Sequence, residues 1–227
     1  MARWSAERWA ASSGIAFGIV LIVSNFLAGT PPHYNASSNT IVSFLDDHHR
    51  ALVVGSILGG ALIVLFLWFI ASFAGMYREA GQNRLATIMY GAVVATVSLG
   101  AAGDAIGIAA TQLRTTIDPS AVQTLYGVSF FFYLKLMWPL AALALAAALA
   151  THRSKVLPEW YTALSLIGAV LFVLAGLSLR MHGFFSPTGA MPMIGVVVLA
   201  LWAVTSSVLC MQKHAVAHAL PHAALSH

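Results

Sequence analysis

The sequence predicts an all-α integral membrane protein built as a bundle of six transmembrane helices. Of its 227 residues, 59% are hydrophobic and only 8% are charged, whereas a soluble domain carries about 25% charged residues. The apolar residues also gather in runs of a length that crosses a bilayer as a helix, about 20 residues. Helices are expected because lipid offers backbone groups no other hydrogen-bond partner.

The predicted spans are joined by short connections, and their approximate ranges are 10–28, 51–76, 85–112, 122–150, 161–179 and 191–212. They form one transmembrane domain over residues 1–212. Residues 213–227 are predicted to be a disordered, histidine-containing cytoplasmic tail, because Pro221 interrupts helical spacing there. The single cysteine, Cys210, excludes an internal disulfide framework.

The longest connection, 29–50, carries a helical pattern of its own. In "SSNTIVSFLDDHHR" (37–50), Ser37, Ser38 or Asn39 can cap a helix. The apolar residues that follow fall on one stripe: Ile41, Val42, Phe44 and Leu45. We therefore expect a short amphipathic helix at the outer interface, just before the second span.

Residues 30–76 resemble a domain-of-unknown-function group of small bacterial polytopic membrane proteins. The resemblance lies in a Pro-rich turn, then a short helix that runs into the second span. The matching residues are Ser38, Ile41, Val42, Phe44, Leu45, His48 or His49, and Arg50. It implies a multi-pass protein of the bacterial inner membrane, and it implies no activity or catalytic residue.

The basic residues at the ends of the spans predict the orientation. One side collects seven of them: Arg3, Arg8, Arg78, Arg84, Arg153, Lys155 and Lys213. The other side collects three: Arg50, Arg114 and Arg180. Because cytoplasmic loops carry the excess of lysine and arginine, both termini are predicted to be cytoplasmic.

Two ionisable residues, Asp104 and Lys135, lie inside predicted spans. Intramembrane charges usually face a bundle interior or a water-filled cavity. The two helices are consecutive and antiparallel, and their turn at Pro119 and Ser120 is equally distant from both residues along the chain. We therefore expect Asp104 and Lys135 at one depth, joined by a salt bridge.

Other residues extend this predicted polar site. Pro139 has no N–H, so the Lys135 carbonyl loses its helical hydrogen bond. Phe131, Phe132 and Trp138 lie on the adjoining surface. The site is interpreted as a place for a small ligand or for proton relay. The alternative is a purely structural role, in which the ion pair holds the two helices together. Removing one partner of a buried ion pair destabilises a protein by about 3–5 kcal/mol.

The histidines fall outside the span cores, so axial ligation of haem within the bundle is not expected. An outer group of Asp46, His48, His49 and His182 has ligand types that suit a divalent metal. The alternative is a solvated interfacial helix in which Asp46 pairs with Arg50. No other cofactor is predicted.

Three functions remain open from the sequence. The first is a small membrane protein that binds or transports a small ligand or protons through Asp104 and Lys135. The second is a non-catalytic subunit of a larger membrane complex, which would form with further copies of this chain or with other subunits. Glycine pairs such as Gly55 and Gly59 support it, because they allow close packing between helices. The third is a membrane enzyme with the outer metal site. The sequence contains no hydrolase or nucleotide-binding motif, and its partners are expected to be lipid and small molecules rather than nucleic acid.

Overall fold

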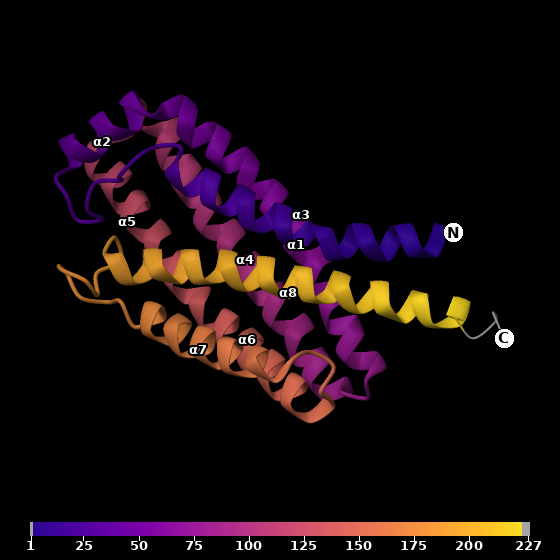
Figure 1. Cartoon of the computed structure of the whole chain (residues 1–227). Helices are drawn as coiled ribbons and strands as arrows, with labels where there is room; N and C mark the ends of the chain where they lie inside the picture. Colours follow the sequence, from indigo (N-terminus) through magenta and orange to yellow (C-terminus); the bar gives the residue numbers. More distant parts are fainter. Residues whose placement is uncertain (1, 224–227) are drawn as a thin grey trace.

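The computed structural model describes residues 2–223, with side chains described from 12 to 213. Within that range all regular structure is helical, as Figure 1 shows. The elements are α1 (Ala2–Phe26), α2 (Ser38–Asp47), α3 (His49–Glu79), α4 (Asn83–Leu113), α5 (Pro119–Lys135), α6 (Met137–Ser154), α7 (Glu159–Gly176) and α8 (Ala190–Ala223).

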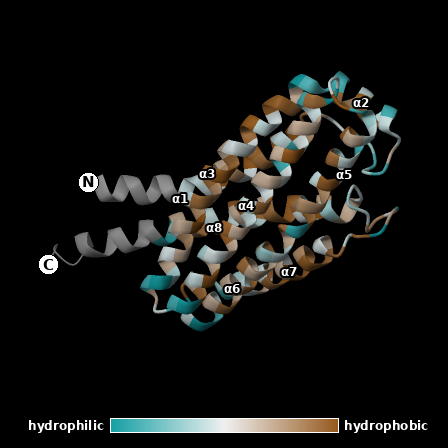
Figure 2. Ribbon diagram, turned by 180° about the vertical axis from the view of Figure 1, so that it is seen from behind, coloured by the Kyte–Doolittle hydropathy of each residue, from teal (hydrophilic) through white to brown (hydrophobic). Residues whose placement is uncertain are grey.

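Five segments of the described chain are helices long and apolar enough to cross a bilayer, as expected of a multi-pass helical membrane protein. They are His49–Glu79, Asn83–Leu113, Pro119–Ser154, Glu159–Gly176 and Ala190–Lys213. The first helix contributes a shorter apolar stretch, Ser12–Phe26. Figure 2 shows brown, hydrophobic residues along these helices and teal, hydrophilic residues mostly at their ends.

The fourth predicted span is divided in the structure. α5 ends at Lys135 and α6 begins at Met137, with Leu136 between them. The Leu140 N–H donates to the Leu136 carbonyl at 3.3 Å, but Pro139 has no N–H to offer the Lys135 carbonyl. The proline thus divides the helix where the sequence analysis expected a lost hydrogen bond.

The predicted amphipathic helix is α2. The Ser37 side chain accepts from the Thr40 N–H and caps it, and Ile41 and Leu45 are its buried residues. The Asp46 carboxylate accepts from Arg114 Nε at 2.5 Å, which ties α2 to the end of α4. Arg114 therefore takes the place that the sequence analysis considered for Arg50.

The two ends of the bundle differ in how densely they are packed. We call the half nearest the turns 80–82 and 155–158 the closed half, and the half nearest α2 and the loop 177–189 the open half. Over the bundle α1 packs between α3 and α8, α4 contacts α3 and α6, and α7 joins α6 to α8, so these six helices form a closed ring.

Buried aromatic residues with hydrogen-bonded polar groups fill the closed half. The Tyr77 and Thr151 hydroxyls lie 2.5 Å apart, as do those of Tyr161 and Ser206. Trp202 is 2% exposed and meets the rings of Phe69 and Phe73 edge-on. These buried side chains make the closed half a densely packed core.

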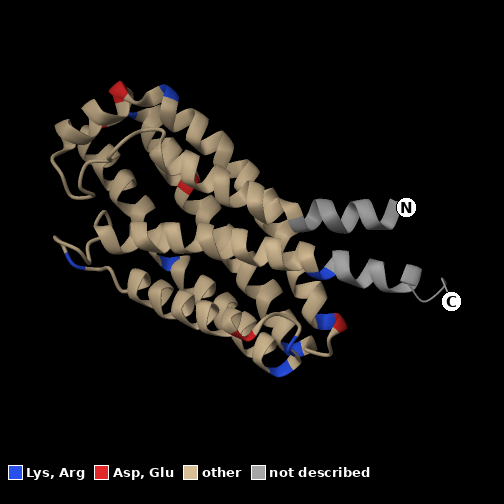
Figure 3. Cartoon of the chain, viewed as in Figure 1, with Lys and Arg blue, Asp and Glu red and all other residues tan. Residues whose placement is uncertain are grey.

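Charged residues gather mainly at the two ends of the bundle (Figure 3). The start of α1 and the end of α8 lie on the same side in Figure 1. α8 continues to Ala223, so residues 213–223 are helical where the sequence analysis expected a disordered tail. The segment is rich in alanine and extends an existing helix, which avoids the cost of nucleation. Residues 224–227 lie outside the described chain.

Candidate ligand site

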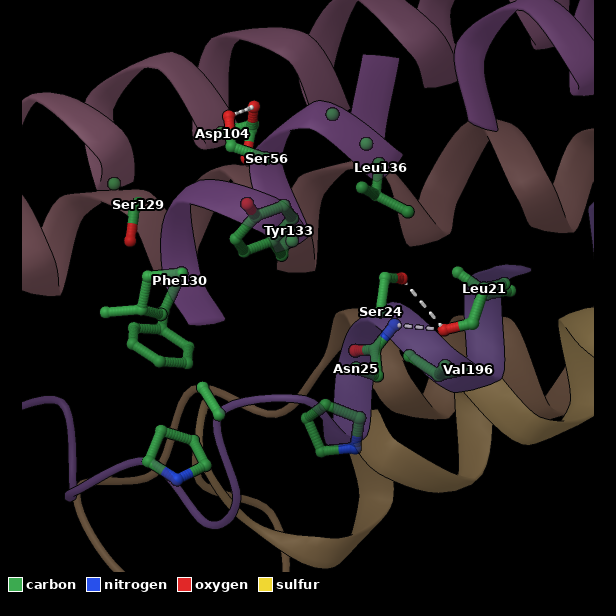
Figure 4. Close-up of a pocket in the computed structure, with 18 of the residues that line it drawn as sticks. Leu21, Ser24, Asn25, Ser56, Asp104, Ser129, Phe130, Tyr133, Leu136 and Val196 are labelled. Carbon is green, nitrogen blue, oxygen red and sulfur yellow. Dashed lines mark hydrogen bonds between the residues drawn. The ribbon is translucent and has the colours of Figure 1, made fainter. Parts of the chain in front are cut away.

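A cavity of about 650 Å³ occupies the open half of the bundle. Its walls come mainly from α1, α3, α4, α5 and α8, with smaller parts from α2 and the start of α6, and the connections after α1 and before α8 contribute Pro31 and Pro187. Figure 4 shows the polar residues of α3 and α4 on one side of this space and those of α1 on the other. The cavity therefore lies between helices that are distant in the sequence.

Small residues leave this space open. Gly55 and Gly59 on α3, and Gly100 and Gly107 on α4, line the cavity. A Cβ added at Gly59 would come no nearer than 3.7 Å to any neighbour, whereas at Gly14 it would lie 2.7 Å from Phe69. Gly14 thus belongs to a tight helix–helix contact, whereas Gly55 and Gly59, which the sequence analysis assigned to close helix packing, border a cavity.

Asp104 is the charged residue of the cavity wall. Its Oδ2 accepts a hydrogen bond from the Ser56 hydroxyl at 2.7 Å, and Figure 4 shows this bond. At a rise of 1.5 Å per residue, Asp104 lies about 13 Å from the open-half end of α4. Among the described residues that line the cavity, no other is Asp, Glu, Lys, Arg or His.

The other polar side chains of the wall mostly bond to nearby backbone. Ser24 Oγ and Asn25 Nδ2 both donate to the Leu21 carbonyl, at 3.1 and 2.8 Å. Ser129 Oγ donates to the Tyr126 carbonyl at 2.7 Å. These hydroxyl and amide groups make a mainly apolar wall slightly polar, and they add no charge to it.

Tyr133 completes the polar side of the site. It lines the cavity from α5, and its ring is 3.3 Å from a Cβ built at Gly103 on α4. The side chains of the described region provide its hydroxyl with no hydrogen-bond partner. A phenolic O–H can both donate and accept, so this group is available to a ligand.

Lys135 does not pair with Asp104. The ion pairs of the described residues are Asp46–Arg114 and Lys155–Glu159, and the Lys135 side chain is exposed. The α5 residues that face α4 are Ser129 against Gly107, Phe132 against Gly103 and Leu136 against Gly100.

Lys135 lies close to the predicted depth, but its side chain does not lie on the predicted face of α5. Successive helix residues are about 100° apart, so Lys135 turns away from α4 when Leu136 faces it. Hairpin symmetry fixes the distance of a residue from the turn but not the direction in which its side chain points. The predicted intramembrane salt bridge is therefore absent from the structure.

The three predicted aromatic residues also lie outside the cavity wall. Phe131 is partly exposed and meets Tyr34 edge-on at 5.7 Å. Phe132 packs on Gly103, and Trp138 lies against Gly176, 3.0 Å from a Cβ built there. Of the predicted ligand-site residues, Asp104 alone lines the cavity.

Sequence reasoning missed Ser56, Ser129, Phe130 and Tyr133. A signal for Ser56 existed, since Gly55, Ser56 and Gly59 share one face of a helix. Its pairing with Asp104 could not be foreseen without the contact between α3 and α4. The three residues of α5 could not be chosen from the sequence, because the rotation of α5 about its axis decides which of its residues face the cavity.

The four residues proposed as metal ligands are engaged separately. Asp46 binds Arg114, and His49 Nε2 lies 3.4 Å from Gln112 Oε1. His48 Nδ1 is 3.0 Å from the Phe44 carbonyl oxygen, and the His182 ring contacts that of His33 at 5.2 Å. No group of three His, Cys, Asp or Glu side chains within the described region is placed to hold a metal ion. The structure does not bring the predicted ligand set together.

Comparison with protein-family models, with curated proteins and with solved structures gives no match. We therefore infer the function from the geometry of the site.

Proposed function

We propose that this protein binds a small amphipathic molecule in the open-half cavity, as a membrane binding or transport protein. The observation that carries the proposal is a cavity of about 650 Å³ with one carboxylate in a mainly apolar wall. Ligand sites of proteins are typically clefts of about 300–1,000 Å³, apolar, with few polar groups that orient the ligand.

The difference between the two halves supports this proposal. The helices of the closed half meet around Tyr77, Tyr161 and Trp202, all buried. In the open half α5 packs mainly against α4 and α2, which leaves α1 and α8 facing it across the cavity. Such an arrangement suits a site that is reached from one side of the membrane.

We further propose six crossings, with both termini in the cytoplasm of a bacterium and the cavity facing outward across the inner membrane. α1 is 25 residues long, and mostly apolar residues follow Arg8 in the sequence up to Phe26; these 18 residues extend about 27 Å, close to a hydrocarbon layer of about 30 Å. Of the basic residues at span ends, Arg78, Arg84, Arg153, Lys155 and Lys213 belong to the closed half, and only Arg50, Arg114 and Arg180 to the open half. The resemblance of residues 30–76 supports the bacterial inner membrane.

The experiment uses a neutral apolar probe, 1-aminoanthracene, whose fluorescence rises in an apolar cavity. Purified protein in detergent should show a saturable fluorescence increase above that of protein-free micelles. The variant Gly59→Leu should lose it, because the leucine side chain would extend into the cavity beside Asp104.

The matched control is Gly60→Leu. Gly60 is the next residue of the same helix, is exposed, and a Cβ added there meets no atom within 4 Å. Both variants replace glycine by leucine and should raise helix propensity equally. Saturable binding that survives Gly59→Leu, or is lost equally in Gly60→Leu, would contradict the proposal.

A further inference from the structure

We infer that the ligand of this cavity is an organic monocation whose positive charge pairs with Asp104. This inference rests on the proposed function and adds the chemical class of the ligand. It follows from the charge of the wall, the unused hydrogen-bonding capacity of the carboxylate and the aromatic rings around it.

The charge of the wall is unbalanced. Asp104 has no ion-pair partner among the described side chains, and the lysine expected to neutralise it points elsewhere. A carboxylate in a membrane interior is costly unless it is paired. A cationic guest would supply the missing charge, whereas an anionic guest would add a second negative charge.

The carboxylate also has unused hydrogen-bonding capacity. An ionised carboxylate offers about four acceptor positions. Asp104 receives one hydrogen bond, from Ser56 to Oδ2, and within the described chain Oδ1 has none. Gly59 keeps the space in front of the carboxyl group free, since a Cβ there would be 3.7 Å from both oxygens. An ammonium group could approach from that direction.

Aromatic rings suit the rest of such a guest. Tyr126, Phe130 and Tyr133 line the cavity from α5, and Phe17 and Phe66 line it from α1 and α3. Ring faces attract cations within about 6 Å of the centroid, and they also bury apolar groups. The wall thus favours a single positive charge on a bulky, apolar or aromatic body.

The test measures the binding of radiolabelled tetraphenylphosphonium by equilibrium dialysis, after subtraction of its uptake by protein-free micelles. The unmodified protein should bind it saturably. Asp104→Asn should weaken binding about tenfold or more, because it removes the attraction between two opposite charges that lie a few ångströms apart at a partly buried site. Asparagine keeps the shape of the side chain and can still accept from Ser56. Thermal unfolding of the variant checks that it folds.

Two controls separate charge from shape. Ser56→Ala keeps the carboxylate and should weaken cation binding less than Asp104→Asn does. Neutral triphenylphosphine oxide should compete poorly with the cation in the unmodified protein. Equal cation affinity in Asp104→Asn, or equal competition by the neutral oxide, would overturn the inference.

The two proposals fail in different ways. If 1-aminoanthracene binds and the cation does not, the cavity binds ligands but not this class. If cation binding persists unchanged in Gly59→Leu, the cation site lies elsewhere and the inference is wrong. If neither probe binds saturably, both the proposed function and the inference are wrong.

Discussion

The Ser56 hydroxyl on α3 donates a 2.7 Å hydrogen bond to Asp104 Oδ2 on α4, across the wall of the open-half cavity. This bond connects two spans that are adjacent in the chain and pack along their lengths. It engages one oxygen of the carboxylate, and within the described chain the other oxygen has no hydrogen bond. Both the stability of the α3–α4 contact and the availability of the site depend on it.

Ser56→Ala should therefore lower the free energy of unfolding by about 1 kcal/mol, the usual contribution of a hydrogen bond between transmembrane helices or to a partly buried polar group. Ser24→Ala is the control, because Ser24 donates to a carbonyl of its own helix. Unfolding in sodium dodecyl sulphate mixtures measures both. A loss in Ser24→Ala as large as in Ser56→Ala would argue against a special role for the bond.

Asp104 and Lys135 should behave as independent residues. The structure gives them no ion pair and turns Lys135 away from α4, so the effects of Asp104→Asn and Lys135→Met on unfolding should add to within about 0.5 kcal/mol. The double variant measured with the two single variants completes the cycle. Recovery of stability in the double variant would instead indicate that the two charges meet.

The polar pair of the closed half should show strong coupling. Tyr77 and Thr151 are fully buried, and their hydroxyls lie 2.5 Å apart. Thr151→Val should cost about 1–3 kcal/mol, because it leaves the tyrosine hydroxyl buried without a partner. Tyr77→Phe combined with Thr151→Val should recover part of that loss, since neither polar group then remains. Denaturation of the three variants tests this, and simple additivity would be the contrary result.

The proposed orientation can be tested with one matched pair of residues. Asn35 and Asn83 are both exposed, in the connection after α1 and at the start of α4. Asn35→Cys should react with an impermeant maleimide in intact cells, and Asn83→Cys should react only after permeabilisation. The unmodified protein is the background control, because Cys210 is 1% exposed. Labelling of the reverse pattern would place the cavity on the cytoplasmic side.

The sequence alone predicted the helices and the amphipathic α2, because apolar length and helix caps are local properties of the chain. The spans expected at 51–76 and 85–112 correspond to α3 and α4, and the buried residues Ile41 and Leu45 of α2 belong to the expected stripe. The effect of Pro139 on the Lys135 carbonyl was predicted for the same reason, although 122–150 was expected as one span and the structure divides it into α5 and α6. A missing N–H acts on its own helix, whatever surrounds it.

The tertiary structure decided which residues form the site. Asp104 was recognisable from sequence because a carboxylate within a span is rare, but its partner was not. The rotation of α5 about its axis turns Tyr133 into the cavity and Lys135 out of it, and a rotation is set by packing against α4 rather than by distance along the chain. Likewise, glycines that look alike in sequence form a tight contact at Gly14 and a cavity wall at Gly59. Which of these outcomes follows depends on whether the opposite helix is close, and only the assembled bundle determines that.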